Sequence, residues 1–201
     1  LSICFCKTCL EKAGKAGIDG EKVAWIVKGL LERLLREDTA FGKNEEIQLT
    51  QIFLEYPELY EYQRFRMNCV THFTMETAAL VHSFGKKYEY IPSSTPFDLN
   101  ASYYEGYELR RLEGTIDGYI PLIYETEDSY NKVLSNIRLF DKSTPVGMGV
   151  NLGRPRYHSK NEFVERIEAA ERSGAFEILS YNYGMATEEM LEWMKTAYTR
   201  K

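Results

Sequence analysis

The sequence lacks several features that would assign it directly to a functional class. No apolar run approaches the roughly 20 residues that a membrane-spanning helix needs. The formal net charge is -5, and this acidic balance repels polyanions such as nucleic acid. No P-loop, G-x-S-x-G elbow or H-E-x-x-H motif is present, which excludes the commonest nucleotide-binding proteins and hydrolases. We therefore expect a soluble, cytoplasmic protein without a nucleotide cofactor, nucleic-acid partner or membrane contact.

The chain does contain enough apolar residues for one good core. It has 201 residues, of which 44% are hydrophobic, so a single structural domain is the expectation. Its first part, 1–86, holds a cysteine cluster and a helical segment, and 87–201 holds four strand-helix units. Leu1 is not an initiator methionine, and no secretory signal follows it. These features predict a chain that is truncated at its amino end.

The strongest pattern in the sequence is a repeat of one strand followed by one helix, at intervals of about thirty residues. The four strands are predicted at Lys87–Ser93, Ile116–Tyr124, Thr144–Asn151 and Ala175–Tyr183. Strands that alternate with helices form parallel sheets, because each helix crosses back over the sheet. The expected fold class is α/β, closed as a (β/α)8 barrel or open as a doubly wound sheet.

Two long helices are expected before these units. Apolar residues at helical spacing predict the first at Glu21–Glu37 and the second at Glu58–Ser83, with Gly85 as its C-cap. The residues expected on the buried side of the second helix are Tyr62, Phe65, Cys69, Val70, Phe73 and Leu80. Within the third unit, Ser159 and Glu162 have the spacing of a capping box, which predicts that a helix begins there.

Three of the four cysteines, Cys4, Cys6 and Cys9, fall within six residues. A domain of this size has no need of a disulfide framework, and C-x-C-x2-C spacing allows three thiolates to converge on one tetrahedral zinc ion. The fourth ligand could be Cys69, His72 or a residue upstream of Leu1. A structural zinc site, an iron–sulfur cluster and ordinary partly buried thiols are the three interpretations.

Both closures of a parallel sheet place binding sites at the carboxyl ends of the strands. The candidate substrate-binding residues at these ends are Ser94, Tyr124, Asn151, Arg154, Asn182 and Tyr183, and the candidate catalytic residue is Glu125. Amides and tyrosines suit a carbohydrate or another polar small molecule, since they offer paired hydrogen bonds and stacking faces. The alternative is that these positions are polar only because they lead into loops.

The glycines of Gly147–Gly153 superficially resemble a phosphate-binding loop. A dinucleotide site needs its glycines at the turn into a helix, whereas Pro155 follows here and the helix is expected only near Lys160. The glycines are better explained by close packing of a strand or by the approach of a ligand to its backbone.

Taken together, the CFCKTC run, the long helical region, the PELYEYQRFRMNCV segment and the four strand-helix units resemble barrel glycoside hydrolases and glycosidase-like proteins. The resemblance spans nearly the whole chain. In such proteins a C-x-C-x2-C run follows the fourth barrel strand, and in β-galactosidases of this type the cysteines hold a zinc ion. In those enzymes a cysteine from further upstream joins them. The resemblance implies that this chain is the carboxyl-terminal half of a barrel. The candidate metal ligands in this chain are Cys4, Cys6, Cys9 and Cys69.

Glycoside hydrolysis generally uses two carboxyl groups. By the same resemblance, one of them would precede Leu1, and the expected nucleophile position falls near Asn151, which is not a carboxylate. Glu125 is left as general acid or base, with Glu127 or Asp128 as substitutes, and activity of this chain alone is not expected. The alternatives are a non-catalytic carbohydrate-binding protein, a metal-organised assembly protein and an open-sheet enzyme. Unpaired strand edges would favour a homo-oligomer or pairing with a missing amino-terminal half.

Overall fold

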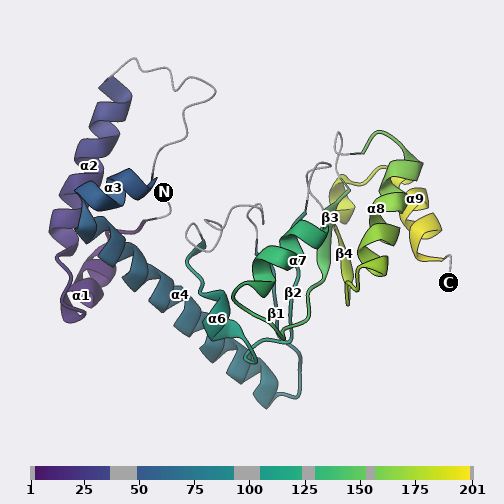
Figure 1. The fold of residues 1–201 in the computed structure, drawn as a ribbon, viewed down its shortest axis with the longest axis horizontal. Helices are drawn as coiled ribbons and strands as arrows, with labels where there is room; N and C mark the ends of the chain where they lie inside the picture. Colours follow the sequence, from purple (N-terminus) through teal and green to yellow (C-terminus); the bar gives the residue numbers. More distant parts are fainter. Residues whose placement is uncertain (1–2, 37–48, 93–104, 124–129, 153–156, 200–201) are drawn as a thin grey trace. The chain divides into compact units, whose positions relative to one another are not determined.

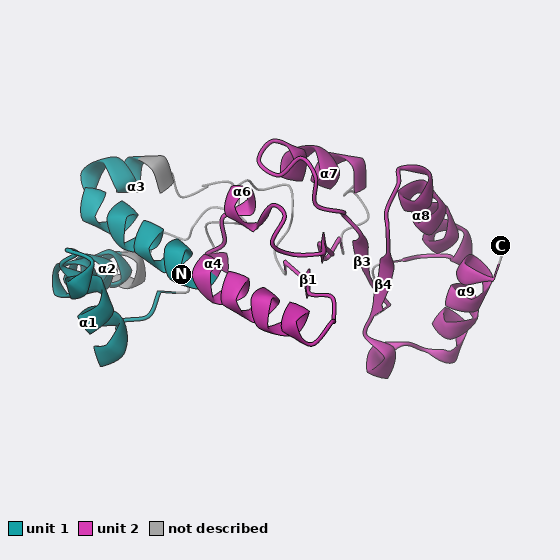
Figure 2. Cartoon of the chain, turned by 90° about the horizontal axis from the view of Figure 1, so that it is seen from below, with its two compact units in different colours: residues 1–70 teal, residues 71–201 magenta. Residues whose placement is uncertain are grey.

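A computed structural model of the chain describes residues 3–36, 49–92, 105–123, 130–152 and 157–199. It is a mostly helical α/β protein with two compact units, Leu1–Val70 and Thr71–Lys201 (Figure 2). The boundary between the units falls inside helix α4, Pro57–Ser83. The division after residue 86, which follows the change from helical to strand-helix pattern, stays a prediction. None of the helices in the described ranges is long and apolar enough to cross a membrane.

The first unit is built from helices around a small apolar core. These helices are α1 (Lys7–Lys15), α2 (Gly20–Arg36), α3 (Leu49–Glu55) and the first part of α4. The buried residues of the core are Ala13, Val23, Val27, Leu59 and Tyr62. A Cβ atom on Gly20 would lie 2.8 Å from Leu10 Cδ2, so α1 and α2 meet closely there. An ion pair between Lys22 and Glu58 adds a link between α2 and α4.

The second unit alternates strands with helices, as the repeat in the sequence predicts (Figure 1). Its elements after α4 are β1 (Glu89–Tyr90), α6 (Leu109–Leu112), β2 (Gly118–Tyr119), α7 (Tyr130–Arg138), β3 (Met148–Asn151), α8 (Lys160–Arg172), β4 (Ile178–Tyr181), the 3-10 turn η1 (Tyr183–Met185) and α9 (Glu188–Tyr198). Each strand lies inside a predicted range and is shorter than that range. Backbone hydrogen bonds continue beyond the strands, for example from Leu122 N–H to Pro92 O.

The strands are parallel and follow one another in chain order. β1 pairs with β2, β3 pairs with β4, and isolated parallel bridges join Tyr119 to Val146 and Leu122 to Gly149. Backbone hydrogen bonds support these bridges, among them Ile123 N–H to Gly149 O at 2.8 Å. The result is two small parallel two-stranded sheets connected through the bridges. Across the described residues no closed barrel is seen.

Glycines in the strands allow the close contacts predicted from the sequence. A Cβ atom on Gly149 would lie 2.6 Å from Leu122 Cδ2, and one on Gly147 would lie 2.6 Å from the carbonyl oxygen of Glu177. Neither position can hold a side chain without a shift of its neighbours. Their role as packing positions within β3 and just before it is therefore supported, and no helix begins directly after them.

The buried side of α4 differs from the predicted one in its carboxyl-terminal part. Tyr62 is buried as expected, but Phe73 and Leu80 are 69% and 60% exposed. The residues of α4 that are buried are Leu59, Tyr62, Gln63, Thr71, Thr74 and Ala78. In the second unit, small residues of this helix face the core, whereas apolar periodicity selects the largest side chains. The prediction that Phe73, Leu80 and Cys69 are buried was wrong.

Helix termini agree well with the predicted signals. α2 and α4 begin one residue before their predicted starts, and Gly85 has a φ of 65° beyond the end of α4. Lys86 N–H donates to Val81 O at 3.3 Å, which satisfies a terminal carbonyl as a glycine C-cap does. Ser159 caps α8 by accepting a hydrogen bond from Glu162 N–H.

Candidate functional site

The first site is the cysteine trio, which we define as Cys4, Cys6 and Cys9. An extended segment precedes α1, and alternate side chains in such a segment point to opposite faces. Ile3 and Phe5 accordingly pack against the core of the first unit, whereas Cys4 and Cys6 are exposed. This alternation directs two of the three thiols away from the core.

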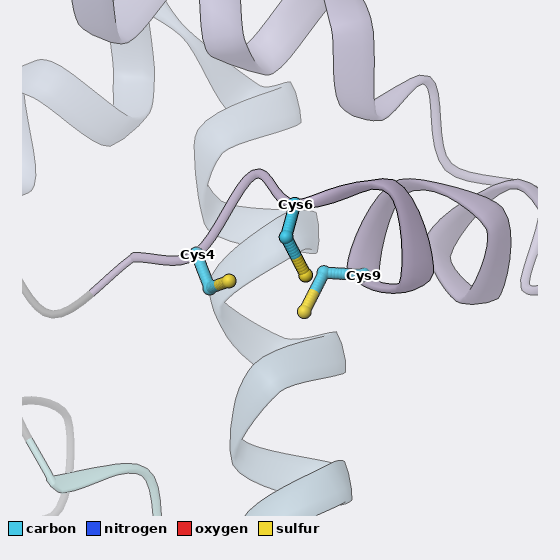
Figure 3. A group of neighbouring side chains, drawn as sticks. All are labelled: Cys4, Cys6 and Cys9. Carbon is cyan, nitrogen blue, oxygen red and sulfur yellow. The ribbon is translucent and has the colours of Figure 1, made fainter.

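The start of α1 brings the third thiol to the same place. Cys6 is the N-cap residue of α1, with extended backbone angles, and Cys9 lies in the first turn. The sulfur atoms of Cys4, Cys6 and Cys9 all lie within 4.8 Å of one another, and Figure 3 shows their side chains converging. Tetrahedral zinc with bonds of about 2.3 Å needs sulfurs separated by about 3.8 Å. Small side-chain rotations would bring the trio to that distance.

Tyr62 holds the segment that carries the trio. Its hydroxyl donates a hydrogen bond of 2.7 Å to the backbone carbonyl of Cys4, and its ring packs on Phe5 with 5.3 Å between the centroids. Burial raises the pKa of Tyr62 to about 12, and the nearby cysteines raise it further. The phenol therefore stays protonated and available as a donor. No sequence pattern marks this anchor, because Tyr62 lies 58 residues from Cys4 in the chain.

The thiols of Cys6 and Cys9 differ in acidity. The pKa of Cys6 is lowered first by the backbone N–H of Cys9 and then by hydrogen bonds from the thiols of Cys4 and Cys9. The pKa of Cys9 is raised to about 12, first by its hydrogen bond with Cys4 and then by that with Cys6. Of these two thiols, Cys6 therefore supplies a thiolate more readily than Cys9. Thiolates are the form that binds zinc, so this donor set suits a soft or borderline metal ion.

The other candidates for a fourth metal ligand are not grouped with the trio. Cys69 is an exposed residue of α4 and is not among the clustered sulfurs. It lies in the same unit as the trio, and the charge of its thiolate form adds to the raised pKa of Tyr62. His72 Nδ1 lies 3.5 Å from Glu76 Oε1. The assignment of Cys69 as a ligand stays a prediction.

The second candidate site consists of the residues predicted at the carboxyl ends of the strands. Asn151 ends β3 and is paired in register with Tyr181, directly before Asn182, so the two asparagines lie at the same edge of neighbouring strands. Asn182 accepts a hydrogen bond of 2.9 Å from Gly184 N–H and caps η1. Tyr183 is 77% exposed. Ser94, Tyr124, Glu125 and Arg154 lie outside the described residues.

A pocket occupies the opposite end of β4. It has a volume of about 500 Å³ and is lined by Glu171, Ala175, Phe176, Glu177, Ile178 and Tyr198. At this amino end, burial raises the pKa of Glu89, and the carboxyl group of Glu177 raises it further. No sequence pattern marks these acidic residues as a site, because the amino ends of strands carry no recognisable motif.

Comparison of the chain with protein-family models, curated proteins and solved structures found no match. The resemblance to barrel glycosidases therefore rests on the pattern of the sequence alone. What the geometry adds is a cysteine cluster able to bind a metal ion and a set of parallel strands with polar residues at their carboxyl ends.

Proposed function

We propose that the chain supplies four consecutive units of a glycosidase-like (β/α)8 barrel and binds a carbohydrate at the carboxyl ends of its strands. One observation carries the proposal. Parallel pairing and bridges follow chain order from β1 through β4. A doubly wound sheet reverses its strand order at a switch point, whereas a barrel adds each new strand to the same side.

The residues at these strand ends support a sugar as the ligand. Asn151 and Asn182 share one edge of the strands, and amides can donate and accept hydrogen bonds to adjacent hydroxyls. Tyr183 is 77% exposed, so its ring is available to stack on the apolar face of a pyranose. In this proposal Ser94, Tyr124 and Arg154 complete the binding residues, and Glu125 acts as general acid or base if the assembled protein hydrolyses glycosides.

The test is calorimetric titration with a panel of monosaccharides and oligosaccharides. We expect Tyr183→Ala to weaken binding about tenfold, because aromatic packing contributes about 1 kcal/mol beyond buried area. Trp25→Ala is the matched control, since Trp25 is 75% exposed on α2 in the other unit. Absence of binding across the panel, or equal affinity of the Tyr183 variant, would refute the proposal.

Catalysis is tested separately from binding. If a bound glycoside is hydrolysed, Glu125→Gln should lower kcat about 100-fold or more. Unchanged turnover would remove Glu125 from the mechanism. Binding without hydrolysis would instead support a lectin-like protein with the same site.

The cysteine trio favours a second candidate, a protein organised by a structural zinc ion. Three sulfurs within 4.8 Å supply three of the four ligands of a structural site. When bound, zinc would cross-link the segment before α1 to the first turn of that helix. Zinc would thereby add folding free energy to a unit with a small core.

Metal analysis of the purified chain tests this candidate. We expect about one zinc ion per chain and loss of zinc in Cys9→Ser, because two ligands of the trio cannot hold the ion tightly. Cys69→Ser shows whether Cys69 is the fourth ligand. If the metal organises an assembly, a chelator should also reduce the mass measured by light scattering. Equal zinc content in the Cys9 variant would refute the site.

A further inference from the structure

Cys6 and Cys9 form a C-x2-C pair at the start of α1. Helix geometry separates the Cα atoms of residues three apart by about 5 Å, which is inside the roughly 4.4–6.8 Å range that a disulfide requires. The two sulfurs already lie within 4.8 Å of each other. Figure 3 shows both side chains directed to the same side of the helix start. Formation of a disulfide here needs side-chain rotation without movement of the helix.

Cys4 is placed less well for the same reaction. It lies two residues before Cys6 in an extended segment, where alternate Cα atoms are roughly 6.6 Å apart, at the upper limit for a disulfide. Its backbone carbonyl is also held by the Tyr62 hydroxyl at 2.7 Å. Closing a bond to Cys4 would therefore pull on an anchored segment, whereas the Cys6–Cys9 pair belongs to one helix turn.

We propose that Cys6 and Cys9 are a redox-active dithiol, and that binding of zinc and formation of their disulfide exclude each other. Cys6 is exposed and Cys9 is partly buried, so an oxidant reaches Cys6 first. The exclusion rests on the zinc candidate described above, because both reactions use the same two sulfurs. The dithiol itself depends neither on that candidate nor on carbohydrate binding.

The oxidant in this proposal is a peroxide. The sulfur of Cys6 attacks one peroxide oxygen, the O–O bond breaks, and an alcohol or water leaves with the proton, which leaves a sulfenic acid on Cys6. The sulfur of Cys9 then attacks the sulfur of Cys6, the S–O bond breaks, and water leaves as the S–S bond forms. Two thiols lose two electrons and two protons, and one peroxide is reduced. A dithiol reductant reverses the change by exchange.

The experiment treats the reduced, metal-free chain of 201 residues with one equivalent of hydrogen peroxide, blocks the remaining thiols by alkylation and digests the product with trypsin. Cleavage after Lys7 and Lys12 separates 1–7, which holds Cys4 and Cys6, from 8–12, which holds Cys9. We expect these two peptides to be joined by a disulfide, with the alkyl group on Cys4. Fragmentation of the peptide on either side of Phe5 in the mass spectrometer shows whether Cys4 or Cys6 carries the alkyl group.

Two variants and a zinc-loaded sample complete the design. Thr8→Ala, at an exposed position between the two cysteines, should behave like the unmodified chain, and Cys9→Ser should lose the cross-link between the peptides. Zinc-loaded chain should form the disulfide at least tenfold more slowly than the metal-free chain, and it should release zinc as it does so.

The outcomes separate this proposal from the zinc candidate. A cross-link through Cys4, or thiol loss without any cross-link, would overturn the dithiol. Equal rates of disulfide formation with zinc retained would overturn the exclusion. A chain that forms the Cys6–Cys9 disulfide but takes up no zinc would support the redox-active dithiol and refute only the zinc site.

Discussion

At the scale of single residues, Asp117 connects the end of a helix to two strands. Its Oδ2 atom accepts hydrogen bonds of 2.7 Å from Tyr88 N–H and from His82 Nε2. Tyr88 precedes β1, Asp117 precedes β2, and His82 belongs to the last turn of α4. The backbone N–H of Tyr88 lowers the pKa of Asp117, and His82 lowers it further. One carboxylate therefore fixes where the chain enters its first two strands.

Replacement of Asp117 should make the stability of the second unit less dependent on pH. Because the folded-state pKa lies below the unfolded value of about 3.9, the carboxylate stabilises the fold above that pH. The contribution is lost as the pH falls through the folded-state pKa. We expect Asp117→Asn to cost about 1 kcal/mol at pH 7, after allowance for solvent screening of a partly exposed group.

Urea unfolding at pH 7 and at pH 3 measures this change. The difference between Asp117→Asn and the unmodified chain should shrink at the lower pH. The reason is that pH 3 lies below the unfolded pKa of about 3.9, so protonation of the unfolded state already removes part of the carboxylate's contribution. Glu165→Gln, which changes an exposed carboxylate on α8, is the control and should have little effect. A constant difference at both pH values would contradict an electrostatic role for Asp117.

At the scale of elements, helix starts are set by local hydrogen bonds that the sequence encodes within a few residues. The hydroxyl of Ser159 accepts a bond of 3.2 Å from Glu162 N–H, and the Glu162 carboxylate accepts one of 2.8 Å from His158 N–H. The predicted capping box is therefore confirmed for Ser159. The Glu162 carboxylate, however, accepts its hydrogen bond from His158 N–H, whereas a capping box expects Ser159 N–H as the donor. Thr187 caps α9 in the same way, by accepting from Met190 N–H.

Loss of the serine cap should destabilise α8 by a measurable amount. We expect Ser159→Ala to lower the free energy of unfolding by about 1 kcal/mol, because an N-terminal N–H loses its acceptor. Ser135→Ala, at an exposed position inside α7, is the matched control. It should be neutral or slightly stabilising, since alanine is the better residue within a helix. Thermal unfolding followed by circular dichroism compares them, and equal losses would argue against the cap.

At the scale of the whole molecule, the two units are built in different ways. The first unit is helical and surrounds a small core, with its cysteine trio at one helix start. In the second unit the architecture depends on the order of the strands. These strands pair through backbone hydrogen bonds such as that from Gly149 N–H to Pro121 O. A metal at the trio and a ligand at the strand ends would therefore act on separate cores.

Features that depend on neighbouring residues were predictable from the sequence, whereas a feature that depends on distant residues was not. The four strand positions, their parallel direction and the helix caps follow from periodicity and turn residues within short windows. The convergence of Cys4, Cys6 and Cys9 was also predictable, because all three lie on one short segment. The buried face in the carboxyl-terminal part of α4 was not predictable from the sequence, since Thr71 and Ala78 are buried there and Phe73 is exposed. Which face a helix buries depends on what packs against it.

The sequence by itself determined where helices and strands form, that the strands run parallel and that three thiols lie together, because each of these depends on residues close in the chain. Only the tertiary structure decided that the strands pair in chain order, that Tyr62 anchors Cys4, and that small residues of α4 face the core. These features join residues far apart in the sequence. Their energies come from close packing and from hydrogen bonds across the fold, which no local pattern records.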